Sequence, residues 1–134
     1  MLAPKAEQSA RSPLQEELIM IAEDSPTTRS TEPPYGNQNK TVARIAYEVL
    51  IENPYKYTER EFYYEVHVVR RNRHDLKIDS FTIRRSELAK KYGWGFHRNS
   101  DNKLALVACD SEKYRELSEK KSVKKIKSCR TSKK

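Results

Sequence analysis

The chain has 134 residues, of which 36% are hydrophobic and 34% charged, and its formal net charge is +8. This length fits a single domain, and so polar a composition indicates that part of the chain lies outside a packed core. No apolar run approaches the ~20 residues of a membrane helix, and no signal-peptide pattern is present, so we expect a cytoplasmic protein, or a nuclear one in a eukaryotic host.

The N-terminal part of the chain predicts a single strand between two irregular segments. Residues 1–13 are rich in Ala, Ser, Gln and Pro and are predicted to be disordered. The apolar run Leu18–Ile21 stands between acidic pairs and predicts a buried strand of about five residues. Residues 24–40 are rich in Pro, Thr, Ser and Asn and predict a long loop.

Two helices are expected next. Residues 41–53 carry hydrophobic side chains at helical spacing, with Asn39 or Thr41 as the cap, and Pro54 ends the pattern. The sequence from Thr58 to Glu61 is a capping box, which predicts a helix with Phe62, Val66 and Val69 on its inner face. Because residues 58–71 are also rich in β-formers, a strand is the alternative there.

The remaining pattern predicts strands and short helices. Phe81 and Ile83 alternate with polar residues and predict a strand, and Ser86 is expected to cap a short helix that Gly93 closes. Residues 94–107 predict a β-hairpin whose turn lies at 99–102. Asp110 is expected to cap a final helix that starts at Ser111.

The expected fold class is therefore α+β, with a small antiparallel sheet and a β-hairpin packed against two to three helices. The domain is expected to span residues 14–117, and residues 118–134 are expected to form a disordered basic tail. Formal charge is −3 over residues 1–39, +4 over 40–117 and +7 over 118–134, so the basic character belongs mainly to the tail.

Basic residues in two regions are candidates for contacting nucleic acid or another polyanion. A run of this kind neutralises phosphates without reading sequence; the alternative is a surface that only aids solubility. The candidates in the tail are Lys120, Lys121, Lys124, Lys125, Lys127 and Arg130, and those in the domain are Arg70, Arg71, Arg84 and Arg85.

The segment Tyr92–Arg98 is the candidate for a ligand pocket. Two glycines flank the single tryptophan, and Tyr92, Trp94, His97 and Arg98 offer aromatic, imidazole and guanidinium groups for a planar or anionic ligand. The alternative is that Trp94 anchors the core as part of a hairpin strand while His97 faces solvent.

Nothing in the sequence names a reaction or a cofactor. The three histidines have no metal-site spacing, and no glycine-rich phosphate loop or nucleophile motif occurs. Cys109 is expected to be a buried strand residue without a disulfide to Cys129. A nucleophilic pair of Cys109 and His97 is the weakest alternative, so no catalytic residue, metal or cofactor is expected, and an enzyme is disfavoured.

Four blocks, taken together, resemble a known family. They are Ile21–Pro26, Lys40–Ala43, Asn53–Thr58 and Lys91–His97. In this order they resemble an uncharacterised, mostly bacterial family classed only as a domain of unknown function. The resemblance covers about residues 15–117 and implies one small α+β domain with no assigned activity. Relative to that pattern the connection before Phe81 is short, and the lysine-rich tail is an addition.

The favoured function is therefore a non-enzymatic binding module that contacts nucleic acid or another polyanion, mainly through the tail. Two alternatives stay open. One is a small-ligand or enzymatic pocket around Tyr92–Arg98, and the other is a protein-interaction domain whose partner the sequence does not identify.

Overall fold

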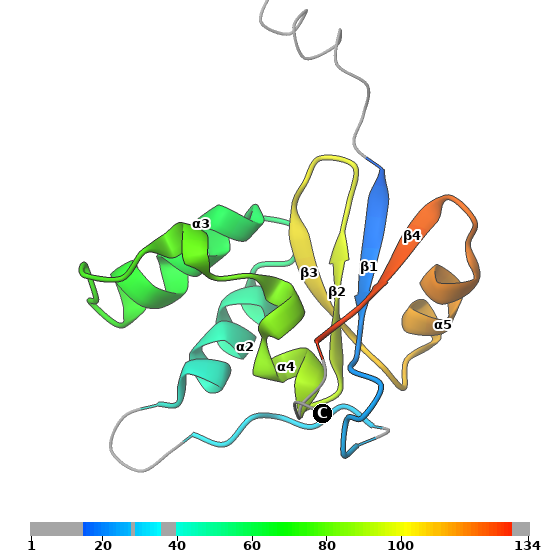
Figure 1. Cartoon of the computed structure of the whole chain (residues 1–134), viewed down its shortest axis with the longest axis horizontal. Coiled ribbons are helices and arrows are strands. Elements are labelled where there is room, and N and C mark those ends of the chain that lie inside the picture. The colour runs from blue at the N-terminus through cyan, green and yellow to red at the C-terminus, as the bar shows by residue number, and fades with distance from the viewer. Residues whose placement is uncertain (1–14, 28, 36–39, 130–134) are drawn as a thin grey trace, which may run out of the picture.

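The computed structural model describes residues 15–27, 29–35 and 40–129. It is an α+β fold, as predicted (Figure 1). The elements in chain order are β1 (Glu16–Met20), α2 (Val42–Glu52), α3 (Glu59–Tyr64), the π-helical segment η1 (Glu65–Arg70), the 3₁₀ turns η2 (Ile78–Ser80) and η3 (Ile83–Arg85), α4 (Glu87–Lys90), β2 (Trp94–Arg98), β3 (Leu104–Ala108), α5 (Glu112–Glu119) and β4 (Val123–Lys127).

The four strands form one mixed sheet in the order β3-β2-β1-β4. The predicted hairpin is confirmed as β2 and β3, and β1 pairs antiparallel with β2. The fourth strand runs parallel to β1, with Val123 opposite Glu16 and Ile126 opposite Ile19. The sheet is therefore mostly, but not wholly, antiparallel.

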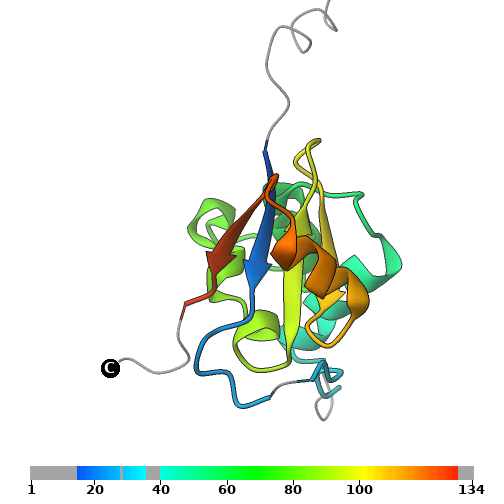
Figure 2. The ribbon, with the colours of Figure 1, turned by 90° about the vertical axis from the view of Figure 1, so that its right-hand side faces the viewer.

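Helices cover both faces of the sheet. In Figures 1 and 2, α2, α3 and α4 lie on one face and α5 lies on the other. Because successive strand residues point to opposite faces, Ile19 is buried in the larger core cluster and Leu18 in the smaller one. The larger cluster holds Phe62 and Phe96, and the smaller one is closed by Tyr114 of α5.

The helix-start signals were largely read correctly from the sequence. Thr41 accepts a hydrogen bond from the backbone N–H of Arg44 at the start of α2, and Thr58 and Glu61 form the predicted capping box of α3. Residues 58–71 are thus helical. The cap predicted at Asp110 is wrong, because Ser111 caps α5 while Asp110 accepts hydrogen bonds from Ser30.

The helix that begins at α3 widens into a π-helix at η1, and this changes which side chains face inward. In a π-helix each N–H bonds five residues back, so the inner face shifts relative to an α-helix. Phe62 and Val66 are buried as predicted, but Val69 is 56% exposed and His67 is buried instead. The prediction of Val69 on the inner face is therefore wrong.

The strand predicted at Phe81–Ile83 is also wrong. The segment forms 3₁₀ turns, and the backbone N–H of Ile83 donates to the carboxylate of Glu59 at 3.0 Å rather than to a neighbouring strand. The hydroxyl of Thr82 accepts from the N–H of Arg84, which favours a turn. Ser86 then caps α4, as predicted.

The disordered tail predicted from residue 118 needs correction, because the fold continues to Lys127. Val123 is buried in the smaller core cluster and Ile126 packs against the larger one, so these two residues hold β4 to the sheet. Lysines fill the exposed positions of this edge strand, and such lysines oppose edge-to-edge pairing. The predicted disorder of residues 1–13 and the contact predicted at Arg130 lie outside the described residues.

Candidate ligand-binding site

A cavity of about 540 Å³ lies on the helical side of the sheet, between the start of α2, η1 and the η2–η3 segment. This volume is in the range of small-ligand pockets. The residues that line the cavity are Thr41, Val42, Ala43, Ala46, Tyr63, Val66, His67, Ser80, Phe81, Thr82, Arg85, Ser86, Glu87 and Tyr92.

Three stacked rings form one wall of this cavity. His67 is 2% exposed and lies 4.1 Å from Phe81 between ring centroids, with an interplanar angle of 26°. The ring of Tyr63 is nearly parallel to that of His67, with a centroid distance of 5.8 Å and an interplanar angle of 6°, and burial raises the pKa of Tyr63. The wall is therefore aromatic, with one imidazole in it.

The imidazole of His67 has one nitrogen bonded and one free. The guanidinium of Arg71 donates to Nδ1 of His67 at 2.7 Å, and a guanidinium has no acceptor, so Nδ1 carries no proton. Burial and then the charges of Arg71 and Arg73 lower the pKa of His67. The neutral ring thus carries its proton on Nε2, which has no protein partner in the part of the chain that the structure describes.

A second cavity of about 660 Å³ adjoins the first and shares Thr41 and Val42 with it. We call the two cavities together the α2–η1 groove. The other residues that line this second cavity are Lys40, Ile45, Glu48, Arg70, Arg71 and Arg73. One end of the groove is therefore aromatic and the other is basic.

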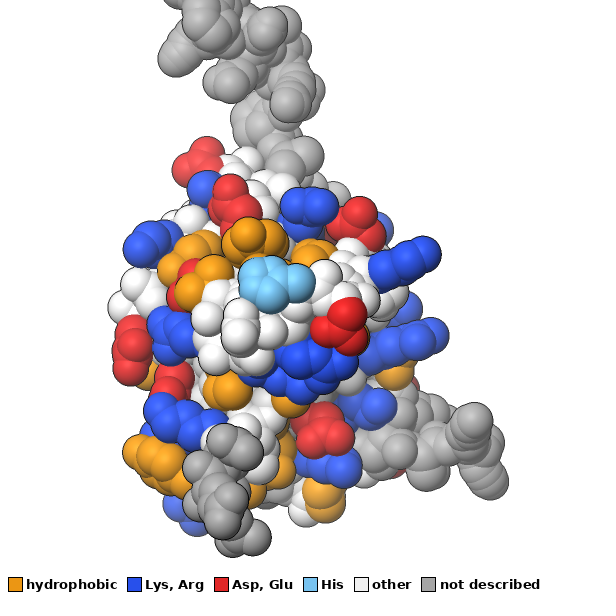
Figure 3. Space-filling model, turned by 90° about the vertical axis from the view of Figure 1, so that its left-hand side faces the viewer, with side chains coloured by type: hydrophobic (Ala, Val, Ile, Leu, Met, Phe, Trp, Pro, Cys, Tyr) orange, Lys and Arg blue, Asp and Glu red, His pale blue; other side chains and the backbone are white. Residues whose placement is uncertain are grey.

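Most of the cations at the basic end are paired with carboxylates. Lys40 lies 2.7 Å from Glu48, whose pKa is lowered chiefly by this hydrogen bond. Arg70 pairs with Glu65 at 3.0 Å, and Arg73 pairs with a carboxylate of its own loop. Figure 3, which looks onto the end of the molecule that carries α3 and η1, shows Lys and Arg side chains with acidic ones among them.

Two arginines of the groove differ from these. Over residues 15–27, 29–35 and 40–129, neither Arg71 nor Arg85 has a carboxylate within ion-pair distance. Arg71 lies at the basic end and touches His67, and Arg85 lines the aromatic end. Their charge is available to an anionic ligand.

The four residues singled out around the hairpin do not converge. Tyr92 lines the aromatic cavity, while the ring of Trp94 packs against Tyr47 and its Nε1–H donates to the carbonyl of Thr31 at 2.9 Å. His97 and Arg98 are successive residues of β2, so their side chains lie on opposite faces of the sheet.

His97 is buried rather than solvent-facing, and both of its ring nitrogens are bonded. Its Nε2 lies 3.0 Å from the carboxylate of Glu16, and its Nδ1 lies 2.6 Å from the hydroxyl of Tyr55. Tyr55 has a positive φ of 60°, which a non-glycine residue rarely adopts, so its backbone is held by its surroundings. This cluster fastens the loop after α2 to the sheet. Burial and then Glu16 raise the pKa of Tyr55.

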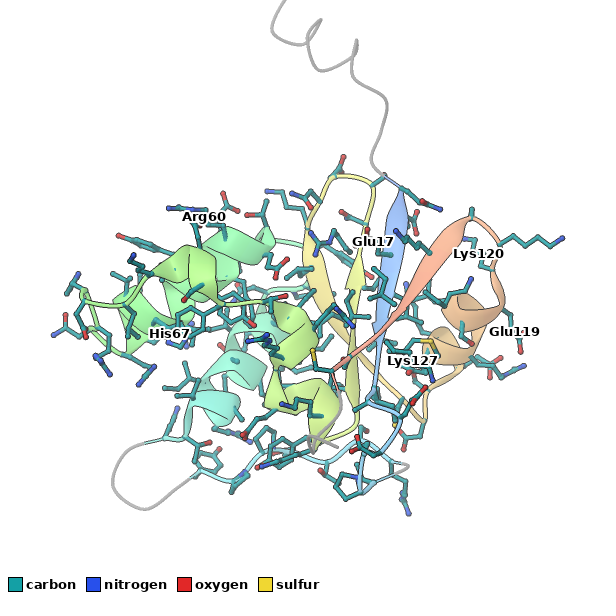
Figure 4. All side chains as sticks on the ribbon, in the orientation of Figure 1. Glu17, Arg60, His67, Glu119, Lys120 and Lys127 are labelled. Carbon is teal, nitrogen blue, oxygen red and sulfur yellow. The ribbon has the colours of Figure 1, made fainter. Side chains whose placement is uncertain are left out.

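The basic residues predicted to contact polyanions separate into two groups. Lys124, Lys125 and Lys127 lie on β4, with Lys120 and Lys121 just before it, and the Nε–H of Arg84 donates to the backbone carbonyl of Lys127. Arg70, Arg71 and Arg85 belong to the groove instead. Figure 4 shows His67 in the helical layer and Lys120 and Lys127 at the two ends of β4.

Other expectations concern cysteines, metals and membranes. Cys109 and Cys129 are both free and partly buried, and burial and then Asp110 raise the pKa of Cys109. Among residues 15–27, 29–35 and 40–129, no three His, Cys, Asp or Glu side chains gather as a metal site would require. No helix in this described part has the length and apolar character to cross a bilayer.

Of the comparisons with known proteins, one finds a family, and that family has no assigned function. The model of the family of unknown function DUF6157 matches residues 12–134, so the chain belongs to this family. The match includes the lysine-rich C-terminal segment, which is therefore part of the family's pattern rather than an addition to it. No curated protein and no solved structure matches the chain.

The α2–η1 groove is not predicted from the sequence, although one local pattern in the sequence indicates part of it. Tyr63, His67 and Arg71 recur every four residues in a predicted helix, which places an aromatic ring, an imidazole and a guanidinium in one row. The aromatic wall also needs Phe81, which comes from a segment that the sequence assigned to a strand.

Proposed function

We propose that this protein is a non-enzymatic binding module for a small anionic ligand that contains a planar ring, held in the α2–η1 groove. One observation carries the proposal. His67 is almost fully buried in the wall of a cavity, its Nε2–H has no partner among the described residues, and an arginine without a carboxylate partner bonds its other nitrogen.

The chemistry of the groove favours binding over catalysis. The Nε2–H of His67 lies in the lining of the cavity and has no partner among the described residues, so it is a donor that a ligand acceptor can use. The lowered pKa of His67 and its bond to Arg71 keep the ring neutral, so it acts as a hydrogen-bond donor rather than as a base. Among the residues that the structure describes, the His67 ring bonds only to Arg71, so none of the described hydroxyls that line the cavity is paired with it for nucleophilic attack.

The test is a titration of the ¹⁵N-labelled chain with phenyl phosphate, followed by two-dimensional NMR. We expect the amide signals of residues around Val42, Val66 and Phe81 to shift together and to saturate. Arg85→Gln should weaken binding by about tenfold, because it removes a charged donor. The matched control is Arg115→Gln on α5, which lies on the other face of the sheet and should bind unchanged. Shifts that scatter over the surface without saturating would contradict the proposal.

A second candidate function is contact with nucleic acid through the lysines of β4. Over the described residues, no carboxylate pairs with Lys120, Lys121, Lys124 or Lys127, and the ammonium of Lys125 donates only to backbone carbonyls. Such unpaired cations along one strand are suited to phosphates. Their exposed positions on an edge strand also explain them without a ligand.

This second candidate is tested by substitution, because deleting the segment would remove a strand. Lys124→Gln with Lys127→Gln should reduce the salt dependence of duplex DNA binding by about one unit of slope for each lysine that contacts a phosphate. Lys113→Gln with Lys103→Gln is the matched control for net charge. Equal slopes for both double variants would exclude a specific role of β4.

A further inference from the structure

The two ends of the α2–η1 groove differ in chemistry, and this difference specifies the ligand more closely than the proposed function does. The aromatic end offers ring side chains and the basic end offers cations, and the shared residues Thr41 and Val42 place these ends side by side. A ligand that spans them needs a planar ring at one end and an anionic group at the other. Cavities of about 540 and 660 Å³ leave room for a spacer between the two.

His67 and Arg71 connect the two ends. Arg71 lines the basic cavity, and its Nη1 lies 2.7 Å from Nδ1 of His67, which lines the aromatic cavity. A ring against the aromatic wall therefore lies near the Nε2–H of His67, and the anionic group lies near the guanidinium of Arg71. Among the described residues the guanidinium of Arg71 bonds only His67, through Nη1, so its other N–H donors remain available to a ligand.

The start of α2 adds to the attraction for an anion. Thr41 caps this 11-residue helix, and the first turn contains no acidic side chain. The positive end of the helix dipole therefore meets no carboxylate of its own first turn where Thr41 and Val42 line both cavities, and Glu48 in the basic cavity is paired with Lys40.

Resting on the function proposed above, we propose that the groove binds a nucleoside monophosphate, with the base in the aromatic cavity and the phosphate at Arg71. A nucleobase has a flat face for the aromatic wall and edge acceptors for the Nε2–H of His67. The sugar is a polar spacer, and a phosphate accepts two parallel bonds from a guanidinium. The aromatic cavity is also lined by the hydroxyls of Thr82 and Ser86 and by a second guanidinium, that of Arg85.

The experiment is isothermal titration calorimetry of the full chain with AMP, UMP, ribose 5-phosphate and phenyl phosphate. We expect at least one nucleotide to bind about tenfold more tightly than either fragment, because only the nucleotide fills both ends. If phenyl phosphate binds as tightly as both nucleotides, the nucleotide proposal fails while the proposed function stands. If no compound binds, both fail.

Variants separate the two ends of the ligand. Arg71→Gln should weaken the nucleotide and ribose 5-phosphate alike, by about tenfold, through loss of the charged hydrogen bonds. His67→Phe should weaken the binding of the nucleotide and leave that of ribose 5-phosphate unchanged, because Phe retains an aromatic ring in the wall but loses the donor. Arg115→Gln is the control, and urea unfolding checks that each variant is folded. Unchanged nucleotide affinity in Arg71→Gln would overturn the proposal.

Discussion

The two buried histidines of this protein, His67 and His97, are similarly buried but differ in how many of their ring nitrogens are hydrogen-bonded. His97 has both nitrogens bonded, to Tyr55 and to Glu16, and sits inside a cluster that holds a loop on the sheet. His67 has one nitrogen bonded by a cation and the other directed at no protein group among the described residues, beside a cavity. Burial alone does not mark a functional histidine; the useful difference is whether its hydrogen bonds are complete.

The largest expected effect on stability comes from breaking the complete cluster. His97→Leu fills a similar volume but leaves the hydroxyl of Tyr55 without its partner and removes the hydrogen bond between Nε2 and the carboxylate of Glu16. We expect a loss of about 1–3 kcal/mol in the free energy of unfolding, measured by urea denaturation. The matched variant His67→Phe should change stability by less than about 1 kcal/mol. Equal losses in the two variants would remove the distinction between the two sites.

A smaller effect is expected from removing a single hydroxyl. Tyr55→Phe keeps the ring and its edge contact with His97 but deletes the 2.6 Å hydrogen bond to Nδ1. The expected loss is about 1 kcal/mol in the same unfolding measurement. Tyr64→Phe is the control, since Tyr64 is 49% exposed. A loss no greater than that of the control would mean that solvent replaces the bond at no cost.

The smallest effect is a dependence of stability on pH that originates at His67. Its pKa is lowered in the folded protein, so below the unfolded value of about 6.5 the unfolded chain binds a proton that the folded chain does not. Stability is therefore independent of this group above that pH and falls as the pH is lowered from there toward the folded pKa. His67→Phe should remove this part of the slope between pH 7 and 5. A slope that is the same in the variant would show that His67 does not contribute to it.

The sequence predicted the elements whose signals are local. The strand at Leu18, the helix capped by Thr41 and the capping box at Thr58 each rest on neighbouring residues, and each is present. The strand β4 escaped prediction because only Val123 and Ile126 interrupt its lysines, and its pairing with β1 is decided by distant residues.

The candidate site was harder to predict for the same reason. Successive side chains of a strand point to opposite faces, so a strand over residues 94–98 already predicts that His97 and Arg98 lie on different faces. A pocket that contains both side chains is therefore incompatible with the predicted strand. The groove depends on η1 and on Phe81, which meet only through tertiary packing. The π-helical turn that buries His67 in place of Val69 has no signature in the sequence that we can identify.

The parallel pairing of β1 with β4 has a consequence for how the chain is made. The two strands are more than 100 residues apart in sequence, so this part of the sheet has very high contact order and forms only after residues 123–127 have left the ribosome. Until then one edge of β1 is unpaired next to an apolar core. A nascent or truncated chain that lacks residues 123–127 would present this edge to other chains, and β4 is the strand of this sheet that closes it.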